Sequence, residues 1–248
     1  MYTSYYGLAE PPFQNTTDQR FLWLGEKHKE ALAALQYGIL ENKGFVLLTG
    51  DVGTGKTTLL NALLQDLGEA TLVASLSDPG VDKIGFLRMV WRLFQIPGKP
   101  KRLEEYFILF EKFLRGAYKA DKRVLLVVDE AQKLTGEILE QIRVLSNIEL
   151  PETKLINIIL AGQDELYEKL QKYSFRALRQ RINIHYRLNT LSEKETIQYV
   201  RHRLKVAGLE KQIFDVKALG SVYRCAKGYP RLINRICDHA LLTGYVRG

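Results

Sequence analysis

The chain has 248 residues, 46% of them hydrophobic and 26% charged, and its formal net charge at pH 7 is +8. This length can bury a substantial core and fits one large domain or a domain with a small satellite, and the composition excludes a disordered chain. No apolar run is long enough to cross a bilayer, and the first residues lack the basic segment followed by an apolar segment that marks a signal peptide. We therefore expect a cytoplasmic protein.

The positive charge of the chain is concentrated in its last third. Residues 171–248 hold 16 Lys/Arg against 5 Asp/Glu, a net of +11, which leaves 20 against 23, a net of −3, for residues 1–170. A basic third suits contact with nucleic acid, an acidic membrane surface or nucleotide phosphates, although a solvated basic face gives the same pattern.

Cys225 and Cys237 are too few for a metal cage or a disulfide framework, so we expect both as small core residues in a reducing compartment.

A glycine-rich loop follows the first predicted elements, a helix over Lys27 to Leu40 and a strand over Phe45 to Leu48. Residues 50–57 read Gly-x-x-x-x-Gly-Lys-Thr and precede a helical pattern of leucines, which is the setting of a phosphate-binding loop. Glycines allow backbone N–H groups to approach phosphate oxygens, and the following helix aims its positive end at the same point. Lys56 would reach the β and γ phosphates, and the Thr57 hydroxyl would join a Mg²⁺ shell. The predicted nucleotide-binding residues of the loop are Gly50, Asp51, Val52, Gly53, Thr54, Gly55, Lys56, Thr57 and Thr58.

Further along the chain, strands and helices continue to alternate. This alternation predicts a parallel sheet with helices on both faces, an α/β fold. The predicted strands are Ala70 to Leu76, Val124 to Val128, Leu155 to Gln163 and Ile182 to Leu188, and the predicted helices are Gly85 to Phe94 and Leu103 to Tyr118.

Two acids end the apolar strand Val124 to Val128. In P-loop enzymes an aspartate at this place holds Mg²⁺, usually through water, and an adjacent glutamate can polarise the attacking water. We therefore assign these roles to Asp129 and Glu130, although an acidic start of the next helix would read similarly. The loop and the acids together predict hydrolysis of ATP or GTP.

Beyond Asn189 the pattern is helical only. A capping box, Ser192-x-x-Glu195, opens a helix through about Val206; a second helix runs from Asp215 to about Lys227, and a third begins at Pro230. We expect residues 1–189 to form an N-terminal segment plus an α/β core, and residues 190–248 to form a small helical lid.

Six segments of the chain add to these motifs: "YYGLAEPPF", "RFLWLGEKHKEAL", "DEAQKL", "LAGQDEL", "LRQRI" and "GYPRLIN". With them, the order of the motifs resembles the AAA+ ATPases. More narrowly, the chain resembles the ExeA/GspA-type ATPases of general secretion and related pilus systems, and transposition ATPases of the TnsC/TniB kind share the core motifs.

The resemblance implies roles for further residues. Gln163 would be a first sensor of the γ-phosphate and Arg231 a second sensor reaching from the lid, although an ordinary strand-end glutamine and a surface arginine fit these places too. Arg181 would be an arginine finger that completes the site of a neighbouring subunit, with Arg179 as second choice. Aromatic residues before the loop would wall the adenine or belong to the core: Tyr5, Phe13 and Phe21.

Other nucleotide-dependent classes fit less well. Helicases with a similar acidic motif need two RecA-like domains, and a GTPase would carry a guanine-reading Asn-Lys-x-Asp that is lacking here. A binding-only scaffold would not need Glu130.

Our leading hypothesis is therefore a Mg²⁺-dependent ATP hydrolase that forms a ring or helical homo-oligomer through Arg181 and drives or times assembly of a secretion or pilus machine. By resemblance the chain would be the cytoplasmic part of a longer inner-membrane protein. The alternative is a transposition-type ATPase that oligomerises on duplex DNA with ATP through its basic third.

Overall fold

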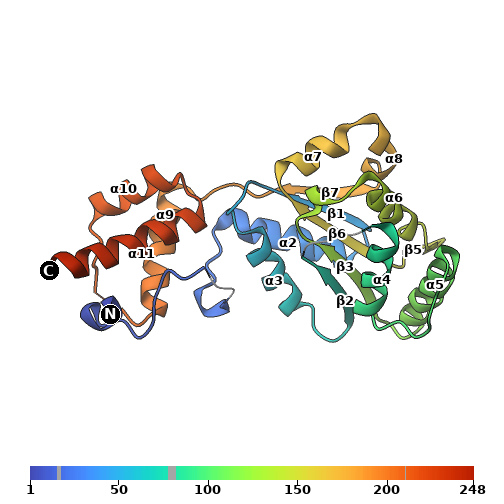
Figure 1. Cartoon of the computed structure of the whole chain (residues 1–248), viewed down its shortest axis with the longest axis horizontal. Helices are drawn as coiled ribbons and strands as arrows, with labels where there is room; N and C mark the ends of the chain where they lie inside the picture. The colour runs from blue at the N-terminus through green and yellow to red at the C-terminus, as the bar shows by residue number, and fades with distance from the viewer. Residues whose placement is uncertain (16–17, 78–81, 210) are drawn as a thin grey trace. The chain divides into compact units, whose positions relative to one another are not determined.

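The computed structural model describes residues 1–15, 18–77, 82–209 and 211–248, which fall into two compact units. We name them the sheet unit, Glu30–Gly50 and Ala62–Arg187, and the lid unit, Met1–Lys29, Asp51–Asn61 and Leu188–Gly248. Figure 1 labels most of their helices and strands. The division predicted between residues 189 and 190 stays a prediction.

The sheet unit is built on five parallel strands in the order β2-β3-β6-β1-β7. The central strands are buried on both faces, which explains their unbroken runs of Val, Ile and Leu. The predicted parallel sheet is thus confirmed. The strands are β1 (Phe45–Thr49), β2 (Thr71–Leu76), β3 (Arg123–Val128), β6 (Asn157–Gly162) and β7 (Ile182–Arg187).

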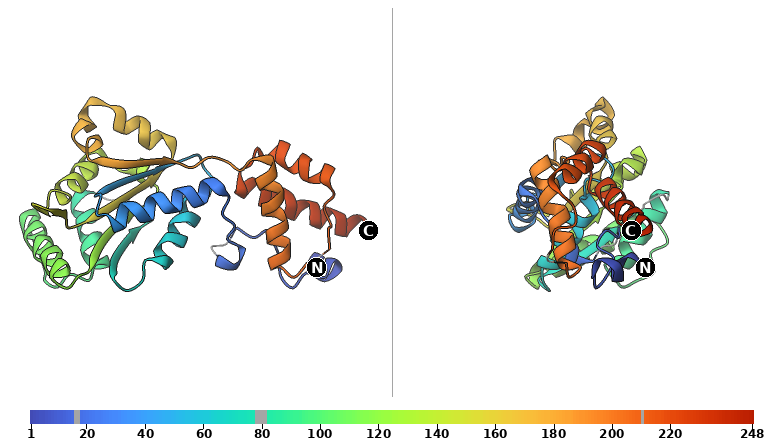
Figure 2. Two further views of the ribbon diagram at one scale, coloured as in Figure 1. Left: turned by 180° about the vertical axis from the view of Figure 1, so that it is seen from behind. Right: turned by 90° about the vertical axis from the view of Figure 1, so that its left-hand side faces the viewer.

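Helices cover both faces of this sheet. Helices α4 and α6 lie on one face and α2 crosses the other, where it is seen in mid blue from behind (Figures 1 and 2). The helices of this part of the chain are α2 (Glu26–Leu40), α3 (Lys56–Asp66), α4 (Lys83–Leu93), α5 (Leu103–Lys119), α6 (Gly136–Leu145), α7 (Asp164–Gln171) and α8 (Arg176–Arg179), with short 3-10 turns η2 (Ala131–Lys133) and η3 (Tyr173–Phe175).

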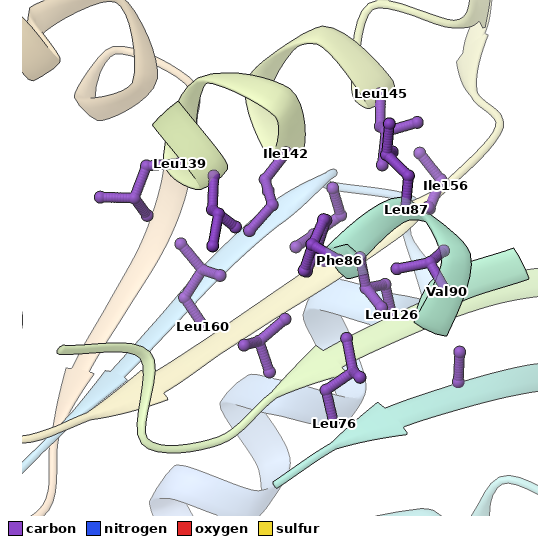
Figure 3. Close-up of a cluster of buried hydrophobic side chains, with 14 of the residues drawn as sticks. Leu76, Phe86, Leu87, Val90, Leu126, Leu139, Ile142, Leu145, Ile156 and Leu160 are labelled. Atoms are coloured by element: carbon purple, nitrogen blue, oxygen red, sulfur yellow. The ribbon is translucent and has the colours of Figure 1, made fainter. Parts of the chain in front are cut away.

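The main core lies under α4 and α6. Figure 3 shows Phe86 and Val90 of α4 with Ile142 of α6 against Leu126 and Leu160 of the strands. All five side chains are at most 2% exposed, so burial of their apolar surface holds the helices on the sheet. Local patterns in the sequence do not predict α6, α7 or the hairpin of β4 (Glu149–Leu150) and β5 (Thr153–Lys154).

The lid unit has a separate core of its own. Its helices are α1 (Tyr2–Tyr6), η1 (Gln19–Phe21), α9 (Glu193–Val206), α10 (Val216–Ala226) and α11 (Pro230–Arg247), which confirms the predicted helical region. The capping box of Ser192 and Glu195 is present at the start of α9. Gly228 has a φ of +77°, and a Cβ there would lie 1.9 Å from the Leu191 carbonyl oxygen, so this turn needs glycine.

Two details of the lid unit correct the sequence analysis. Cys237 is buried, but Cys225 is exposed on α10, so the expectation that both are core residues is wrong for Cys225. Arg203 is buried and donates hydrogen bonds to the carbonyl oxygens of Pro12 and Gln14, so it belongs to the core rather than to the basic surface.

In the described parts of the chain, no helix is both long enough and apolar enough to span a bilayer.

Candidate nucleotide-binding and catalytic site

The phosphate loop begins where β1 ends. Gly53 and Gly55 have φ angles of +80° and +101°, in a region that residues with a side chain rarely adopt. A Cβ would also lie 3.2 Å from Cβ of Arg231 at Gly53, and 3.4 Å from Nε2 of His28 at Gly55. Both glycines are therefore favoured by backbone angle, as the motif predicts, and Gly53 also by the narrow space beside Arg231.

The side chains of the loop are held by its own backbone. Lys56 is only 6% exposed, and its Nζ donates a hydrogen bond of 3.0 Å to the Asp51 carbonyl oxygen. The same oxygen accepts a bond of 2.9 Å from the buried Thr54 hydroxyl. Thr57 and Thr58 lie exposed in the first turn of α3. The dipole of this helix favours an anion at its N-terminus. The loop thus combines a lysine ammonium with a helix N-terminus.

The start of α11 meets this loop within the lid unit. The Tyr229 hydroxyl donates a hydrogen bond of 2.6 Å to Oδ2 of Asp51, and Oδ1 of Asp51 accepts a bond of 2.7 Å from the Val52 N–H. Arg231, predicted as the second sensor, is exposed in the first turn of α11 beside Gly53. The structure therefore brings Arg231 to the phosphate loop, together with a tyrosine that the sequence analysis did not single out.

A buried histidine supports the loop from α2. Nε2 of His28 lies 3.1 Å from the Thr54 carbonyl oxygen, which requires the proton on Nε2. Burial lowers the pKa of His28 below its ordinary value, while the bond to Thr54 and the Glu195 carboxylate act in the opposite direction. His28 is thus a neutral donor to the loop.

The two predicted acids follow β3 in the sheet unit. Asp129 is 5% exposed, and its Oδ1 accepts a bond of 2.8 Å from the Glu130 N–H. Glu130 has a φ of +52°, a left-handed conformation that costs a residue with a side chain about 1 kcal/mol. Such local strain is typical of functional positions.

The acids and the predicted first sensor lie at one edge of the sheet. Val128 pairs with Leu160 on β6, and Thr49 pairs with Gly162, so β1, β3 and β6 end together. Gln163 follows β6, and its N–H donates a bond of 3.1 Å to Oε1 of Gln132. Gln132 in turn donates a bond of 2.6 Å from Nε2 to Oε2 of Glu130. The sequence shows Gln132 in its acidic motif, but gives no sign of this bridge.

The candidate fingers lie elsewhere in the sheet unit. Ile182 pairs with Phe45 at the start of β1, so Arg181 lies at the opposite ends of the strands from Gln163, about 20 Å away along the strands by the rise of six residues. Nη1 of Arg181 donates a bond of 3.0 Å to Oγ of Ser146. Nη1 of Arg179 instead bonds the carbonyl and side-chain oxygens of Gln171, at 2.9 and 3.1 Å. The structure therefore does not bring Arg181 or Arg179 to the acids of the same subunit.

The three aromatic residues before the loop divide between core and surface. Phe13 and Phe21 are buried in the core of the lid unit, and Arg203 lies over the Phe21 ring at 4.8 Å. Tyr5 is exposed and packs edge-on against Tyr245. For Phe13 and Phe21 this favours the core role that the sequence analysis left open.

A family model described as AAA domain matches residues 39–170. The chain belongs to this family. It is also 44% identical, over 249 residues, to the general secretion pathway protein A of Aeromonas hydrophila, a match that covers 100% of this chain and 46% of that protein. The chain thus spans less than half the length of this curated relative.

Solved structures agree on the fold. The Cdc6p protein of Pyrobaculum aerophilum has a TM-score of 0.68 and 17% identity, covering 96% of this chain and 66% of that one. The ORC2 protein of Aeropyrum pernix, in ADPNP–ADP complexes, has a TM-score of 0.62 and 18% identity, covering 92% of this chain and 68% of that one. The predicted AAA+ fold and the resemblance to the general secretion ATPases are confirmed, and the chain is an AAA-type domain of the ATPase class.

Proposed function

We propose that the chain binds ATP with Mg²⁺ and hydrolyses it, with Glu130 polarising the attacking water. The observation that carries this proposal is the acid pair Asp129 and Glu130 at the carboxyl end of a strand buried on both faces, beside the end of β6. Carboxylates at such a place are costly to bury unless they serve a ligand or a partner. A domain that only bound nucleotide would not need the strained glutamate.

The residues of the phosphate loop fit a triphosphate. Gly53 and Gly55 keep the backbone open for close approach, and the Lys56 ammonium lies folded over the loop on the Asp51 carbonyl. We propose that Lys56 binds the β and γ phosphates and that Arg231 adds a positive charge from the lid unit. The adjacent α3 N-terminus favours the same anion.

The donor set also fits Mg²⁺, which prefers oxygen ligands and keeps several waters. We propose that the Thr57 hydroxyl is a ligand and that Asp129 acts through water. Within the described residues no group of three or more His, Cys, Asp or Glu side chains is suited to hold a metal by itself. With so few protein ligands, phosphate and water oxygens would complete the ligand shell of the ion. When bound, the ion would neutralise charge on the phosphates.

Arg181 is proposed to act on a neighbouring subunit, because it lies at the opposite ends of the strands from its own acids. It lines a cavity of about 240 Å³ together with Lys43, Lys154 and Ser146. Burial and the nearby Arg181 lower the pKa of Lys154, whose ammonium is paired with the Glu149 carboxylate. An anionic group of a neighbouring subunit, such as a nucleotide phosphate, would be favoured by the guanidinium of Arg181.

For the biological role we propose assembly of a secretion or pilus machine, with the components of that machine as partners. The support is the 44% identity to general secretion pathway protein A. We propose that this chain is one part of a larger protein and that it acts on the cytoplasmic side of a membrane.

A second candidate is a DNA-associated ATPase. Residues 188–248 hold 11 Lys/Arg against 5 Asp/Glu, and most of these cations are exposed. One solved structure of the same fold, the Aeropyrum pernix ORC1 protein at 13% identity and a TM-score of 0.61, is a complex with DNA. The exposed cations on α9, including Arg201 and Lys205, would contact phosphates.

Release of phosphate from Mg·ATP tests the proposed activity. We expect the wild type to turn over ATP, EDTA to stop it, and Lys56→Ala to weaken ATP binding about tenfold or more, since a charge-assisted contact is lost. Lys119→Ala, at an exposed lysine of α5, is the matched control. Turnover that is the same in Lys56→Ala and the control would reject the proposal.

A further inference from the structure

The Gln132 side chain connects two residues that the proposed reaction uses. Its Nε2 donates a bond of 2.6 Å to Oε2 of Glu130, and its Oε1 accepts a bond of 3.1 Å from the Gln163 N–H. The Gln163 N–H can only donate, so it fixes Oε1 on its own side and leaves Nε2 to face the carboxylate. The orientation of the amide is therefore set by the neighbouring strand.

The surrounding structure holds Gln132 in this position. Nζ of Lys169 on α7 donates bonds of 2.9 Å to the Gln132 carbonyl oxygen and 2.7 Å to the Leu134 carbonyl oxygen, which clamps the η2 turn. A Cβ on Gly162 would lie 2.7 Å from Oε1 of Gln132 and 3.2 Å from its backbone nitrogen. The glycine at the end of β6 thus leaves the space that the bridge occupies.

The bridge also constrains Glu130 itself. Its backbone is in the left-handed region, and its N–H is bound to Oδ1 of Asp129. With the backbone fixed in this way, the remaining freedom is in the side chain, and the amide of Gln132 holds one carboxylate oxygen. The other oxygen is left to accept a hydrogen bond from a water.

We propose that Gln132 is a positioning residue, which orients the Glu130 carboxylate for the attacking water and couples it to the end of β6 that carries Gln163. The proposal rests on the proposed function, because it presupposes ATP hydrolysis. It predicts that Gln132 acts on the rate of hydrolysis through Glu130 and has little effect on ATP binding. A purely structural role, in which Gln132 only satisfies the Gln163 N–H, predicts a different pattern in the variants below.

Three variants separate the two roles. Gln132→Met keeps the length of the side chain and loses both hydrogen bonds. Gln132→Glu keeps an acceptor for the Gln163 N–H, and hence the structural contact, but loses the donor to Glu130. Gln141→Met, at a half-buried glutamine of α6, is the matched control.

We expect kcat for ATP to fall about 10- to 100-fold in both Gln132→Met and Gln132→Glu, with KM within about twofold of the wild type. Melting temperatures report whether each variant is folded. Single-turnover hydrolysis then compares Gln132→Met in the wild-type and Glu130→Gln backgrounds. If Gln132 acts through the carboxylate, its effect should shrink to less than about twofold once the carboxylate is gone.

Three results would overturn the proposal while leaving ATP hydrolysis intact. They are wild-type kcat in Gln132→Met, retained kcat in Gln132→Glu, or an equal loss in both backgrounds. A wild-type protein that does not hydrolyse ATP at all would overturn the proposed function and this inference together. The wild-type rate therefore tells the two failures apart.

Discussion

The Tyr229 hydroxyl donates a hydrogen bond of 2.6 Å to the Asp51 carboxylate, joining the start of α11 to the phosphate loop. The same turn carries Arg231 beside Gly53. The bond is charge-assisted but exposed to solvent, so we expect it to contribute about 1 kcal/mol to ordering of the loop.

Tyr229→Phe should therefore weaken ATP binding about fivefold, because a less ordered loop loses more conformational freedom when it binds phosphates. Fluorescence anisotropy with a labelled ATP analogue measures the change in Kd. Tyr223→Phe, on α10, is the matched control. Identical affinities for the two variants would show that the bond does not order the loop.

The buried His28 gives the lid unit a pH dependence. Its pKa is lowered by burial, so the folded protein holds the ring neutral while the unfolded chain takes up a proton near pH 6.5. The unfolded state then binds more protons as the pH falls, and the free energy of unfolding decreases through and below that pH. His28→Gln keeps a donor for the Thr54 carbonyl and should lose this part of the decrease.

Urea unfolding at pH 7.5, 6.5 and 5.5 measures the effect. Burial also lowers the pKa of His185 and His202, and both are present in the wild type and the variant, so their contribution cancels in the difference. His239→Gln, at an exposed site of α11, is the matched control. Equal pH slopes in wild type and His28→Gln would contradict the prediction.

Local sequence patterns predicted the phosphate loop, the five strands of the sheet and the three lid helices. Each depends on neighbours in the chain: glycines that permit positive φ, apolar runs buried on two faces, and a capping box. The contacts of Tyr229 with Asp51 and of Gln132 with Gln163 join residues 178 and 31 positions apart, and no local pattern encodes them. The net charge of the basic third also includes Arg203, although its side chain is buried and does not belong to the basic surface.

The β4–β5 hairpin and the exposure of Cys225 were missed for a related reason. The strands of the β4–β5 hairpin have two residues each, too few for an alternating pattern to be recognised. Cys225 was expected in the core because it lies in a helix, but which face a helix buries depends on its partners. Gln163 and Arg181 were assigned by resemblance, and their roles stay predictions.

The arginine finger can be tested by mixing two inactive proteins. Lys56→Ala lacks a working loop and Arg181→Ala lacks the finger, so a mixed assembly contains some interfaces with both parts intact. We expect partial recovery of ATP hydrolysis, and a rate that rises more than linearly with protein concentration for the wild type. Arginine fingers contribute roughly 10³- to 10⁵-fold in rate.

Co-assembly of the two variants must be shown separately, for example by sedimentation of a tagged pair. A mixture that co-assembles and stays inactive would exclude Arg181 as a residue acting between subunits. Repeating the mixture with Arg179→Ala would then test the second choice, whose guanidinium is bound to Gln171 in this structure.

The DNA-associated alternative predicts that the ATP-bound chain binds duplex DNA with little dependence on sequence and with affinity that falls steeply as salt rises. Fluorescence anisotropy at two salt concentrations measures this. Arg201→Ala and Lys205→Ala should each reduce the salt slope by about one, whereas Lys119→Ala is the control. No binding at low salt with ATP present would remove this alternative.

The most direct test of the central claim, ATP hydrolysis with Glu130 as the base, is Glu130→Gln. The change keeps the shape of the side chain and removes its capacity to take a proton, so the affinity for ATP should stay within about twofold while phosphate release falls about 10²- to 10⁴-fold. Equilibrium binding and single-turnover phosphate release on the same preparation measure both quantities. A Glu130→Gln protein that binds ATP and releases phosphate at the wild-type rate would contradict the account.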